Sequence, residues 1–282
     1  MPSLPLWLIP SARLRIGITY WWQHGRWPDL STPTRFTEHV QRRKLTDRDP
    51  AMPLLADKVG VKRHVAHVLG AQWLIPTLWS GDTLPQTPPA PFPFILKARH
   101  GCNQNIVCRD AGDWAMAGRR AAKWVRRPYG LWLDEWAYRD LPRGYLVEPY
   151  IGTEAALPID YKIYVFGGRA THVQIHRKRG SDHRWTLFDT VWRRVSAADG
   201  DDPAPPRHLG AMLTAAAAMA RPFDFARVDF YEVADTPLFG EISFYPGSGL
   251  DPFDPVAIDT ALGALWPATE TREQLPWEGA PC

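Results

Sequence analysis

Two segments near the C-terminal end, residues 226–231 and 239–245, restrict the fold of this chain more than any other part of the sequence, because polar and apolar side chains alternate along them. Side chains two residues apart lie on the same face of a β-strand. This alternation predicts two polar rows, one of Arg227, Asp229 and Tyr231 and the other of Glu241, Ser243 and Tyr245. A tight turn at residues 236 and 237 is expected to pair the two strands. The sequence therefore predicts a hairpin on which two carboxylates meet.

The two carboxylates of this hairpin, Asp229 and Glu241, allow two interpretations. Carboxylates on neighbouring strands repel each other unless a cation lies between them. A Mg²⁺ ion that bridges nucleotide phosphates takes one or two carboxylates as its protein ligands, so the pair is a candidate magnesium site. The alternative is a surface cluster that Arg227 neutralises. The hairpin alone does not decide between them.

The apolar pattern of the rest of the chain predicts further strands and helices. Residues 92–98 and 106–108 predict a hairpin around a polar loop, and Gly167-Gly168 predicts a second hairpin. The strands of that second hairpin are expected at 160–166 and 170–176. The other expected elements are a strand at 144–150, helices at 51–69, 114–127 and 211–221, and a short element at 13–22 followed by a polar loop to residue 45. Strands with helices inserted between them predict an α+β fold.

Length and composition exclude several classes of protein. At 282 residues the chain is long enough for one large or two modest domains without disulfide or metal staples. The 3 cysteines, Cys102, Cys108 and Cys282, show no CxxC spacing, which argues against a disulfide framework and against structural zinc. A net charge of +3 does not indicate a nucleic-acid-binding protein. No apolar stretch approaches the roughly 18 residues of a membrane span and no signal peptide is recognisable, so we expect a cytoplasmic protein.

A second group of charged residues lies upstream of the carboxylate hairpin. Glu148 ends an expected buried strand, and Glu154 follows six residues later. Asp160 and Lys162 open the next strand with their side chains on one face. Together with Lys97, these residues supply acceptors for adenine and ribose and cations for phosphates. They therefore predict a nucleotide site.

In this order the motifs resemble those of the ATP-grasp superfamily, and in particular its TupA-like branch, which is named for teichuronopeptide biosynthesis. The resemblance covers roughly residues 20–265 and rests on Ala56-Asp57-Lys58, Leu74-Ile75-Pro76, Phe94-Ile95-Leu96-Lys97, Asp160-Tyr161-Lys162, Arg227-Val228-Asp229-Phe230-Tyr231 and the run from Gly240 to Gly249. It implies an α+β ATP-grasp fold in which two antiparallel-sheet lobes sandwich ATP. The expected division is a divergent N-terminal region at 1–85, an N-terminal lobe at 86–150, and a C-terminal lobe at 151–282 that carries the metal site and a C-terminal tail.

The resemblance also implies which residues contact the nucleotide. Lys97 would contact the α-phosphate and the adenine edge, and Lys58 would be a second lysine on the phosphate side. The other nucleotide contacts would be Glu148 and the backbone near Tyr150 at adenine, Glu154 at the ribose, and Asp160 and Lys162 at the start of the next strand. ATP and Mg²⁺ are therefore the expected cofactors.

The metal and the catalytic residues are implied in the same way. Asp229 and Glu241 would bind Mg²⁺, while Ser243 stands where many ATP-grasp proteins place an asparagine as the third ligand. A serine hydroxyl is a weaker oxygen donor than that amide. Lys162 would offset charge on the transferred phosphoryl group, and Arg227 would stabilise the negatively charged transition state. These two residues are the expected catalytic residues.

The activity that the resemblance implies is ligation of a carboxylate to an amine at the expense of ATP. ATP phosphorylates the carboxylate, and an amine attacks the acyl phosphate to form an amide. The association of TupA-like proteins with cell-surface polysaccharide or peptide-polymer assembly implies a small-molecule or glycan carboxylate as a partner. The candidate substrate residues are Arg177, Arg179, His183 and Arg184 in a basic cluster, and Gly247, Ser248 and Gly249 in a glycine-rich segment.

Three other activities remain open from the sequence. A kinase that stops at a phosphorylated product would use the same nucleotide residues. A metal-dependent glycosyltransferase would use the Asp-x-Asp pair of Asp199 and Asp201 to hold a sugar nucleotide. A nucleotide-binding module without catalysis would need no acceptor site.

Overall fold

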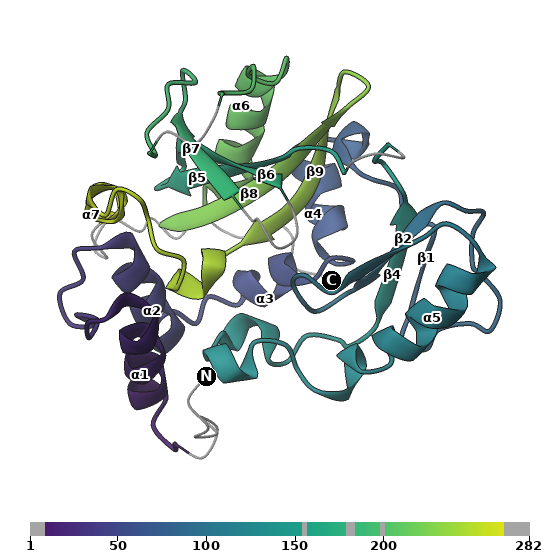
Figure 1. The fold of residues 1–282 in the computed structure, drawn as a ribbon, viewed down its shortest axis with the longest axis horizontal. Helices are drawn as coiled ribbons and strands as arrows, with labels where there is room; N and C mark the ends of the chain where they lie inside the picture. The colour runs from purple at the N-terminus through teal and green to yellow at the C-terminus, as the bar shows by residue number, and fades with distance from the viewer. Residues whose placement is uncertain (1–8, 154–156, 179–183, 198–200, 268–282) are drawn as a thin grey trace.

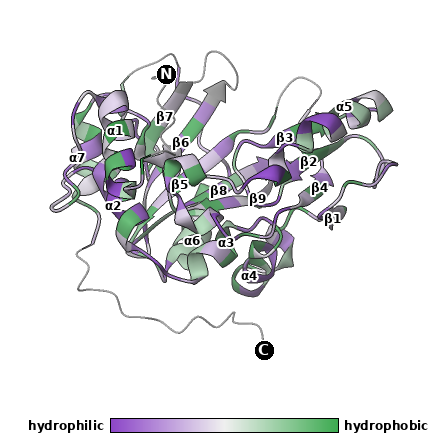
Figure 2. Ribbon diagram, turned by 90° about the horizontal axis from the view of Figure 1, so that it is seen from below, coloured by the Kyte–Doolittle hydropathy of each residue, from purple (hydrophilic) through white to green (hydrophobic). Residues whose placement is uncertain are grey.

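Two antiparallel sheets organise the chain, as seen in a computed structural model that describes residues 9–153, 157–178, 184–197 and 201–267 (Figure 1). The first sheet has the strand order β1-β4-β2-β3 and the second has the order β7-β6-β5-β8-β9. Both views place β9 on the side of the second sheet that faces the first sheet (Figures 1 and 2). The α+β class predicted from the sequence is confirmed. Among the described residues, no helix has the length and apolar character needed to cross a membrane.

The first sheet carries the predicted hairpin of β2 (Phe94–Ala98) and β3 (Asn105–Cys108). Strand β4 (Tyr145–Pro149) pairs with the other edge of β2, so that Glu148 stands opposite Ile95. Strand β1 (Trp79–Gly81) extends the sheet beyond β4, which means that the sheet begins before the expected lobe boundary at residue 86. Helix α5 (Ala111–Ala121) packs its buried face on this sheet and is followed by the 3₁₀ turn η3 (Trp124–Arg126).

The second sheet contains β5 (Asp160–Phe166), β6 (Arg169–Lys178), β7 (Arg184–Asp189), β8 (Phe225–Val233) and β9 (Thr236–Ser243). Gly167 and Gly168 form the β5–β6 turn with φ of 53° and 76°, as predicted. The β8–β9 turn lies at Ala234 and Asp235, with φ of 47° and 60°, and not at residues 236 and 237. Pro237 cannot supply a positive φ, because its ring holds φ near −65°.

The N-terminal helices differ most from the prediction. Helix α1 (Ala12–His24) is followed by α2 (Phe36–Thr46), where the sequence predicted a polar loop. The predicted helix at 51–69 is two helices, α3 (Ala51–Ala56) and α4 (Val61–Val68). The chain leaves α3 in an extended conformation at Asp57, whose carboxylate is paired with Arg99, and this break separates the two helices. The remaining elements are η2 (Ala71–Trp73), η4 (Leu131–Leu133), η5 (Trp136–Tyr138), α6 (Leu209–Ala220), η6 (Pro246–Gly249) and α7 (Ala257–Gly263).

Helix α2 belongs to the core of the second sheet. Its Phe36 is 1% exposed, and its ring centroid lies 5.0 Å from that of Phe225. Arg43 of the same helix donates to the carbonyl oxygens of Phe225 and Phe244 at 2.8 and 3.2 Å. Helix α6 packs on this sheet as well and is coloured mainly as hydrophobic (Figure 2). Helix α2 therefore completes the second sheet's core, next to α7, and α1 packs on α2 (Figure 1).

This assignment of α2 predicts a loss of stability. Replacing Phe36 with alanine should lower the free energy of unfolding by about 3–5 kcal/mol, since a fully buried aromatic ring is removed and a cavity remains. Urea unfolding followed by circular dichroism measures the change. Trp22→Ala is the matched control, because Trp22 is 51% exposed and should shift the free energy by less than about 0.5 kcal/mol. Equal effects of the two substitutions would contradict the placement of α2 in the core.

Candidate active site

The carboxylate hairpin forms as the alternation predicts. Strands β8 and β9 pair with Asp229 opposite Glu241 and Arg227 opposite Ser243. The register shifts by one residue next to Asp229, which leaves Phe230 opposite Phe239. Residues directly opposite on an antiparallel pair hold their Cβ atoms about 4.5–5.5 Å apart. The two candidate metal ligands are therefore close enough to share one cation.

A guanidinium connects these two carboxylates. Arg227 donates from Nε to Oδ1 of Asp229 and from Nη2 to Oδ2, both at 2.8 Å. Its Nη2 also lies 3.7 Å from Oε1 of Glu241. On the neighbouring strand β5, Lys162 Nζ lies 2.5 Å from Oδ2 of Asp229 and 2.6 Å from Oδ2 of Asp160. The expected catalytic cations thus both contact the expected metal ligand Asp229.

Burial and charge act against each other at these groups. Burial raises the pKa of Asp229, which is 1% exposed, against the opposing effect of Arg227 and Lys162. Burial also favours the neutral form of Glu241, but Lys58, Lys162 and Arg227 outweigh it and lower its pKa. Opposite charges stabilise each other strongly where water is excluded. A charged ligand that enters here therefore competes with existing ion pairs.

A second cluster lies on the first sheet around Glu148. Lys97 Nζ on β2 lies 2.6 Å from Oε2 of Glu148, and Lys62 Nζ on α4 lies 2.5 Å from Oε1. Lys62 also donates to the carbonyl of Ile75 at 2.7 Å. Burial works to raise the pKa of Glu148, but the two lysines lower it. The structure therefore places Lys62 beside two of the predicted nucleotide residues, Lys97 and Glu148.

The sequence analysis did not assign Lys62 a role. Its signal was the scarcity of lysine, since only seven of the 33 basic residues are lysines. Lys58 lies in the break between α3 and α4, and Lys62 lies on the first turn of α4. In the expected continuous helix at 51–69, Lys58 and Lys62 would lie one turn apart on the same face. The sequence therefore did not indicate that they contact different carboxylates.

Lys58 connects the carboxylate hairpin to the chain directly after β2. Its Nζ lies 3.1 Å from Oε2 of Glu241 on β9, and its backbone amide donates to the carbonyl of Arg99 at 3.1 Å. Arg99, directly after β2, donates from Nε to Oδ1 of Asp57 at 2.7 Å. The α3–α4 break thus connects the loop after β2 to the carboxylate hairpin. It brings a predicted phosphate-side lysine into contact with a predicted metal ligand.

Several of the predicted nucleotide and substrate residues lie at the edge of the described ranges or outside them. Tyr150 follows β4, is half-buried, and donates from its hydroxyl to the carbonyl of Thr153 at 3.1 Å. Glu154, Arg179 and His183 lie outside the described residues, and so does Asp199. The backbones of Arg177 and Arg184 belong to β6 and β7, and their side chains are also outside the described set.

The predicted glycine-rich substrate segment and Arg227 line one pocket. Gly247 and Gly249 of η6 contribute to its wall, together with Arg227 of β8. Its other walls come from Pro246 of η6, from α2, from the strands β5 to β7, and from the segment after η6: Phe36, Thr37, Tyr164, Gln174, His176, Trp185, Asp251 and Phe253. This aromatic and polar lining comes from segments that lie far apart in the sequence.

The donor set suits Mg²⁺ better than a metal held entirely by protein. Asp229 and Glu241 offer carboxylate oxygens, and Ser243 lies opposite Arg227 with its side chain buried. Within the described ranges, no three His, Cys, Asp or Glu side chains form a ready metal site. Mg²⁺ commonly binds through one or two carboxylates and completes its shell with substrate phosphates and water. The donor types at this hairpin therefore suit Mg²⁺ that arrives with a nucleotide, but the ion would have to displace Arg227 or Lys162 from the oxygens of Asp229.

Two antiparallel sheets, one carrying paired lysines and the other a carboxylate hairpin, define an ATP-grasp fold. The chain belongs to the TupA-like ATP-grasp family, which it matches over residues 38–266. This confirms the resemblance found in the sequence. No curated protein sequence matches the chain.

Several solved structures are similar to this fold at low identity. D-alanine–D-alanine ligase from Bacillus anthracis, complexed with ATP, is 11% identical with a TM-score of 0.43, and the match covers 68% of this chain and 56% of that one. The corresponding ligase from Helicobacter pylori is 13% identical with a TM-score of 0.49, over 86% and 68%. L-amino acid ligase from Bacillus licheniformis is 12% identical with a TM-score of 0.45, over 84% and 52%. The chain thus spans 52% to 68% of the length of these proteins.

Proposed function

We propose that this chain is an ATP-dependent ligase that joins a carboxylate to an amine through an acyl phosphate. The observation that carries the proposal is the buried group of Asp229, Arg227 and Lys162 with the half-buried Glu241 beside it, of which Arg227 lines the pocket between η6 and the second sheet. Membership in an ATP-grasp family supports ATP as the phosphoryl donor. Arg227 also lines the small pocket at η6, and we place the second substrate beside it.

In this proposal the nucleotide binds between the Glu148 cluster and the carboxylate hairpin. Lys97 and Lys58 face the phosphates, and Glu148 accepts the adenine amino group. Glu154 contacts the ribose. The remaining nucleotide contacts come from Lys62, the backbone near Tyr150, Asp160 and Lys162. When the nucleotide binds, its phosphates would replace Glu148 and Glu241 as partners of Lys97 and Lys58. Each of these lysines then keeps an anionic partner.

Asp229 and Glu241 would hold Mg²⁺, with Ser243 as a weaker third donor. Bound there, the ion would neutralise phosphate charge and polarise the transferred group. The chain's own cations remain beside it, since Lys162 and Arg227 both contact Asp229. They keep the carboxylate oriented and offset charge on the phosphoryl oxygens.

The reaction needs activation because a free carboxylate resists attack by an amine. A carboxylate oxygen attacks the γ-phosphorus of ATP, and ADP leaves with the electrons of the broken bond. The amine nitrogen then attacks the acyl carbon, and inorganic phosphate leaves as the amide forms. Arg227, which lines the pocket, would stabilise the oxyanion of this second step.

The finer parts of the proposal concern the acceptor and the setting. The acceptor is a small-molecule or glycan carboxylate, used in cell-surface polysaccharide or peptide-polymer assembly in the cytoplasm. The basic residues Arg177, Arg179, His183 and Arg184 would attract it, with Gly247 and Gly249 at the pocket and Ser248 between them. We keep the division at 1–85, 86–150 and 151–282, except that β1 (Trp79–Gly81) belongs to the N-terminal lobe because it pairs with β4.

Incubation with ATP, Mg²⁺ and a panel of carboxylates and amines tests the reaction by mass spectrometry. We expect ADP together with a product lighter by one water than its two substrates combined. A reaction without ATP serves as the control. A phosphorylated end product without the amide would identify a kinase, and AMP formation would exclude the acyl-phosphate route.

A further inference from the structure

The η6 segment has an unusual backbone conformation. Gly247, Ser248 and Gly249 have consecutive φ values of 52°, 57° and 63°, all in the left-handed region. Glycine adopts this region without cost, but a side chain at Ser248 disfavours it. Such strain persists only where surrounding contacts hold it, and it concentrates at functional sites. The contacts that hold Ser248 therefore indicate what the turn is for.

Side chains of α2 hold the carbonyl oxygens of this turn. Lys44 Nζ donates to the carbonyl of Ser248 at 2.9 Å and to its hydroxyl at 2.8 Å. Gln41 Nε2 donates to the same carbonyl at 2.8 Å and to that of Gly249 at 3.0 Å. His24 Nε2 of α1 lies 3.3 Å from the Gly249 carbonyl. Three side chains from the N-terminal helices thus converge on two peptide groups.

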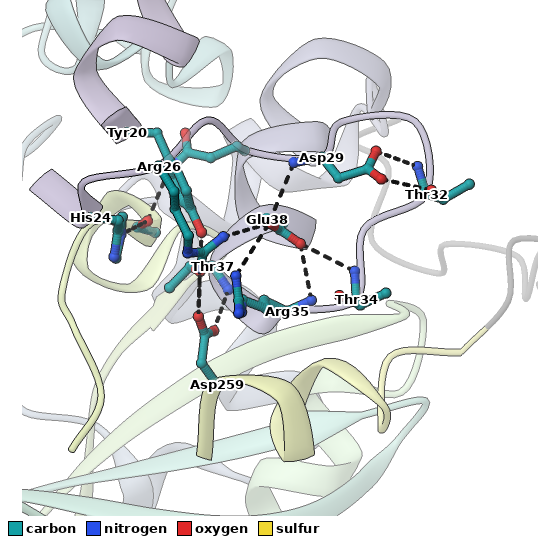
Figure 3. A network of polar contacts seen from close by, with 12 residues as sticks. Tyr20, His24, Arg26, Asp29, Thr32, Thr34, Arg35, Thr37, Glu38 and Asp259 are labelled. Carbon is teal, nitrogen blue, oxygen red and sulfur yellow. Dashed lines mark hydrogen bonds and ion pairs between the residues drawn. The ribbon is translucent and has the colours of Figure 1, made fainter. Parts of the chain in front are cut away.

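The helix that carries Lys44 is itself fixed to the rest of the molecule. Thr37 donates from its amide and hydroxyl to the carboxylate of Asp259 on α7, at 2.9 and 2.7 Å (Figure 3). Tyr20 of α1 hydrogen-bonds the Thr37 hydroxyl at 2.9 Å (Figure 3). Glu38 accepts from Arg26 at 2.7 Å in the same network (Figure 3). Helix α2 is therefore a rigid support for the turn.

Lys44 keeps an ammonium group where burial disfavours it. It is 3% exposed, and burial lowers its pKa to about 8, although Glu135 and Asp134 act in the opposite direction. Burial raises the pKa of Glu135 to about 7, against Lys44 and a hydrogen bond from Ser248. A buried charge of this kind is costly for stability. The defined conformation of the η6 turn is the benefit that offsets the cost of burying the Lys44 ammonium group.

We propose that Lys44 is a positioning residue, which holds the Pro246–Gly249 turn in the shape that acceptor binding beside Arg227 requires. One side of the turn faces the pocket and the other side contacts Lys44. Gly247 and Gly249 line the pocket with Arg227, whereas the Ser248 hydroxyl meets Lys44. Phe36 and Thr37 of α2 also line that pocket. The N-terminal helices thus belong to the acceptor site, and the identity of the acceptor as a carboxylate rests on the proposed function.

Hydrogen–deuterium exchange of the ligand-free full chain tests the positioning directly. The amides of Ser248 and Leu250 donate within the turn, to Tyr245 and Gly247, at 2.8 and 2.9 Å. Lys44→Met should speed exchange of the 245–251 peptide at least tenfold while the peptides of β8 and β9 exchange as before. Lys123→Met is the matched control, because Lys123 is exposed. Gln41→Leu offers a second, uncharged variant and should act in the same direction with a smaller effect.

Kinetics separate a positioning role from general loss of structure. With the carboxylate and amine that give product in the panel, Lys44→Met should raise KM for the carboxylate at least tenfold and leave KM for ATP within twofold. The dissociation constant of Mg²⁺ and a non-hydrolysable ATP analogue, measured by calorimetry, should also stay within twofold.

The two readouts fail independently. Unchanged exchange of the 245–251 peptide in both variants would overturn the proposal, whatever the activity. Faster exchange in a protein that forms no amide with any pair would overturn the proposed function but keep Lys44 as the support of the turn. Equal increases in KM for the carboxylate and ATP would also overturn the positioning role, because the effect would not be confined to the acceptor.

Discussion

Replacing Lys97 with methionine should abolish measurable binding of Mg·ATP. The substitution preserves much of the side-chain volume and removes the charge expected at the α-phosphate. Losing one member of a buried charge pair costs about 2–5 kcal/mol of binding free energy, and each 1.4 kcal/mol is about tenfold in affinity. Isothermal titration calorimetry with Mg·ATP measures the change.

The local structure should tolerate this substitution. Glu148 keeps its second partner, Lys62, at 2.5 Å, so no buried carboxylate is left without a cation. Lys123→Met controls for loss of a lysine on the surface. A Lys97→Met protein that takes up ATP like the parent would refute the assignment of Lys97 to the nucleotide.

Replacing Asp229 with asparagine should reduce turnover by on the order of 100-fold or more. The change keeps the shape of the side chain but removes the charge that pairs with Lys162 and Arg227 and that is expected to bind Mg²⁺. ADP release and amide formation measure the effect, with a thermal melt to verify folding. Because Asp229 is buried among cations, Glu241→Gln provides a second test at a site with 30% of its side chain exposed.

Comparing the turnover of the Asp229→Asn and Asp201→Ala variants distinguishes the ligase from the glycosyltransferase. Asp201 is exposed, and the neighbouring Asp202 accepts a hydrogen bond from Arg194 at 2.7 Å. Asp201→Ala should therefore leave ADP formation unchanged. Turnover of a UDP-sugar without ATP, lost in Asp201→Ala and retained in Asp229→Asn, would establish the glycosyltransferase and reject the ligase.

The hairpins were predictable because their signals are local. In β8 and β9, alternate residues point to one face, so the sequence alone indicated that Asp229 and Glu241 would meet. At Gly167-Gly168 the need for two positive φ angles selects glycine. The β8–β9 turn was misplaced by two residues, since Ala234 and Asp235 carry a weaker turn signal than the following proline.

Helix α2 was missed because its polar residues are buried instead of solvated. Glu38, Gln41, Arg43 and Lys44 are each at most 4% exposed, and the sequence pattern gives no sign of this. Gln41, Arg43 and Lys44 have partners far along the chain, as with Arg43 and the carbonyl of Phe225, whereas Glu38 pairs with residues 26–35 just before the helix. A hydrophobicity pattern detects apolar burial, but it cannot detect polar groups that are buried with distant hydrogen-bond partners.

The sequence by itself indicated the family, the three hairpins and the candidate nucleotide and metal residues, since these depend on residue order and on alternation within short segments. Only the tertiary structure decided that Lys62 joins Lys97 at Glu148, that Lys58 reaches Glu241, and that Lys44 supports Ser248. The physical reason is that a lysine's charge acts over a few ångströms in space. Which carboxylate or carbonyl lies within that distance depends on how segments more than 80 residues apart pack together.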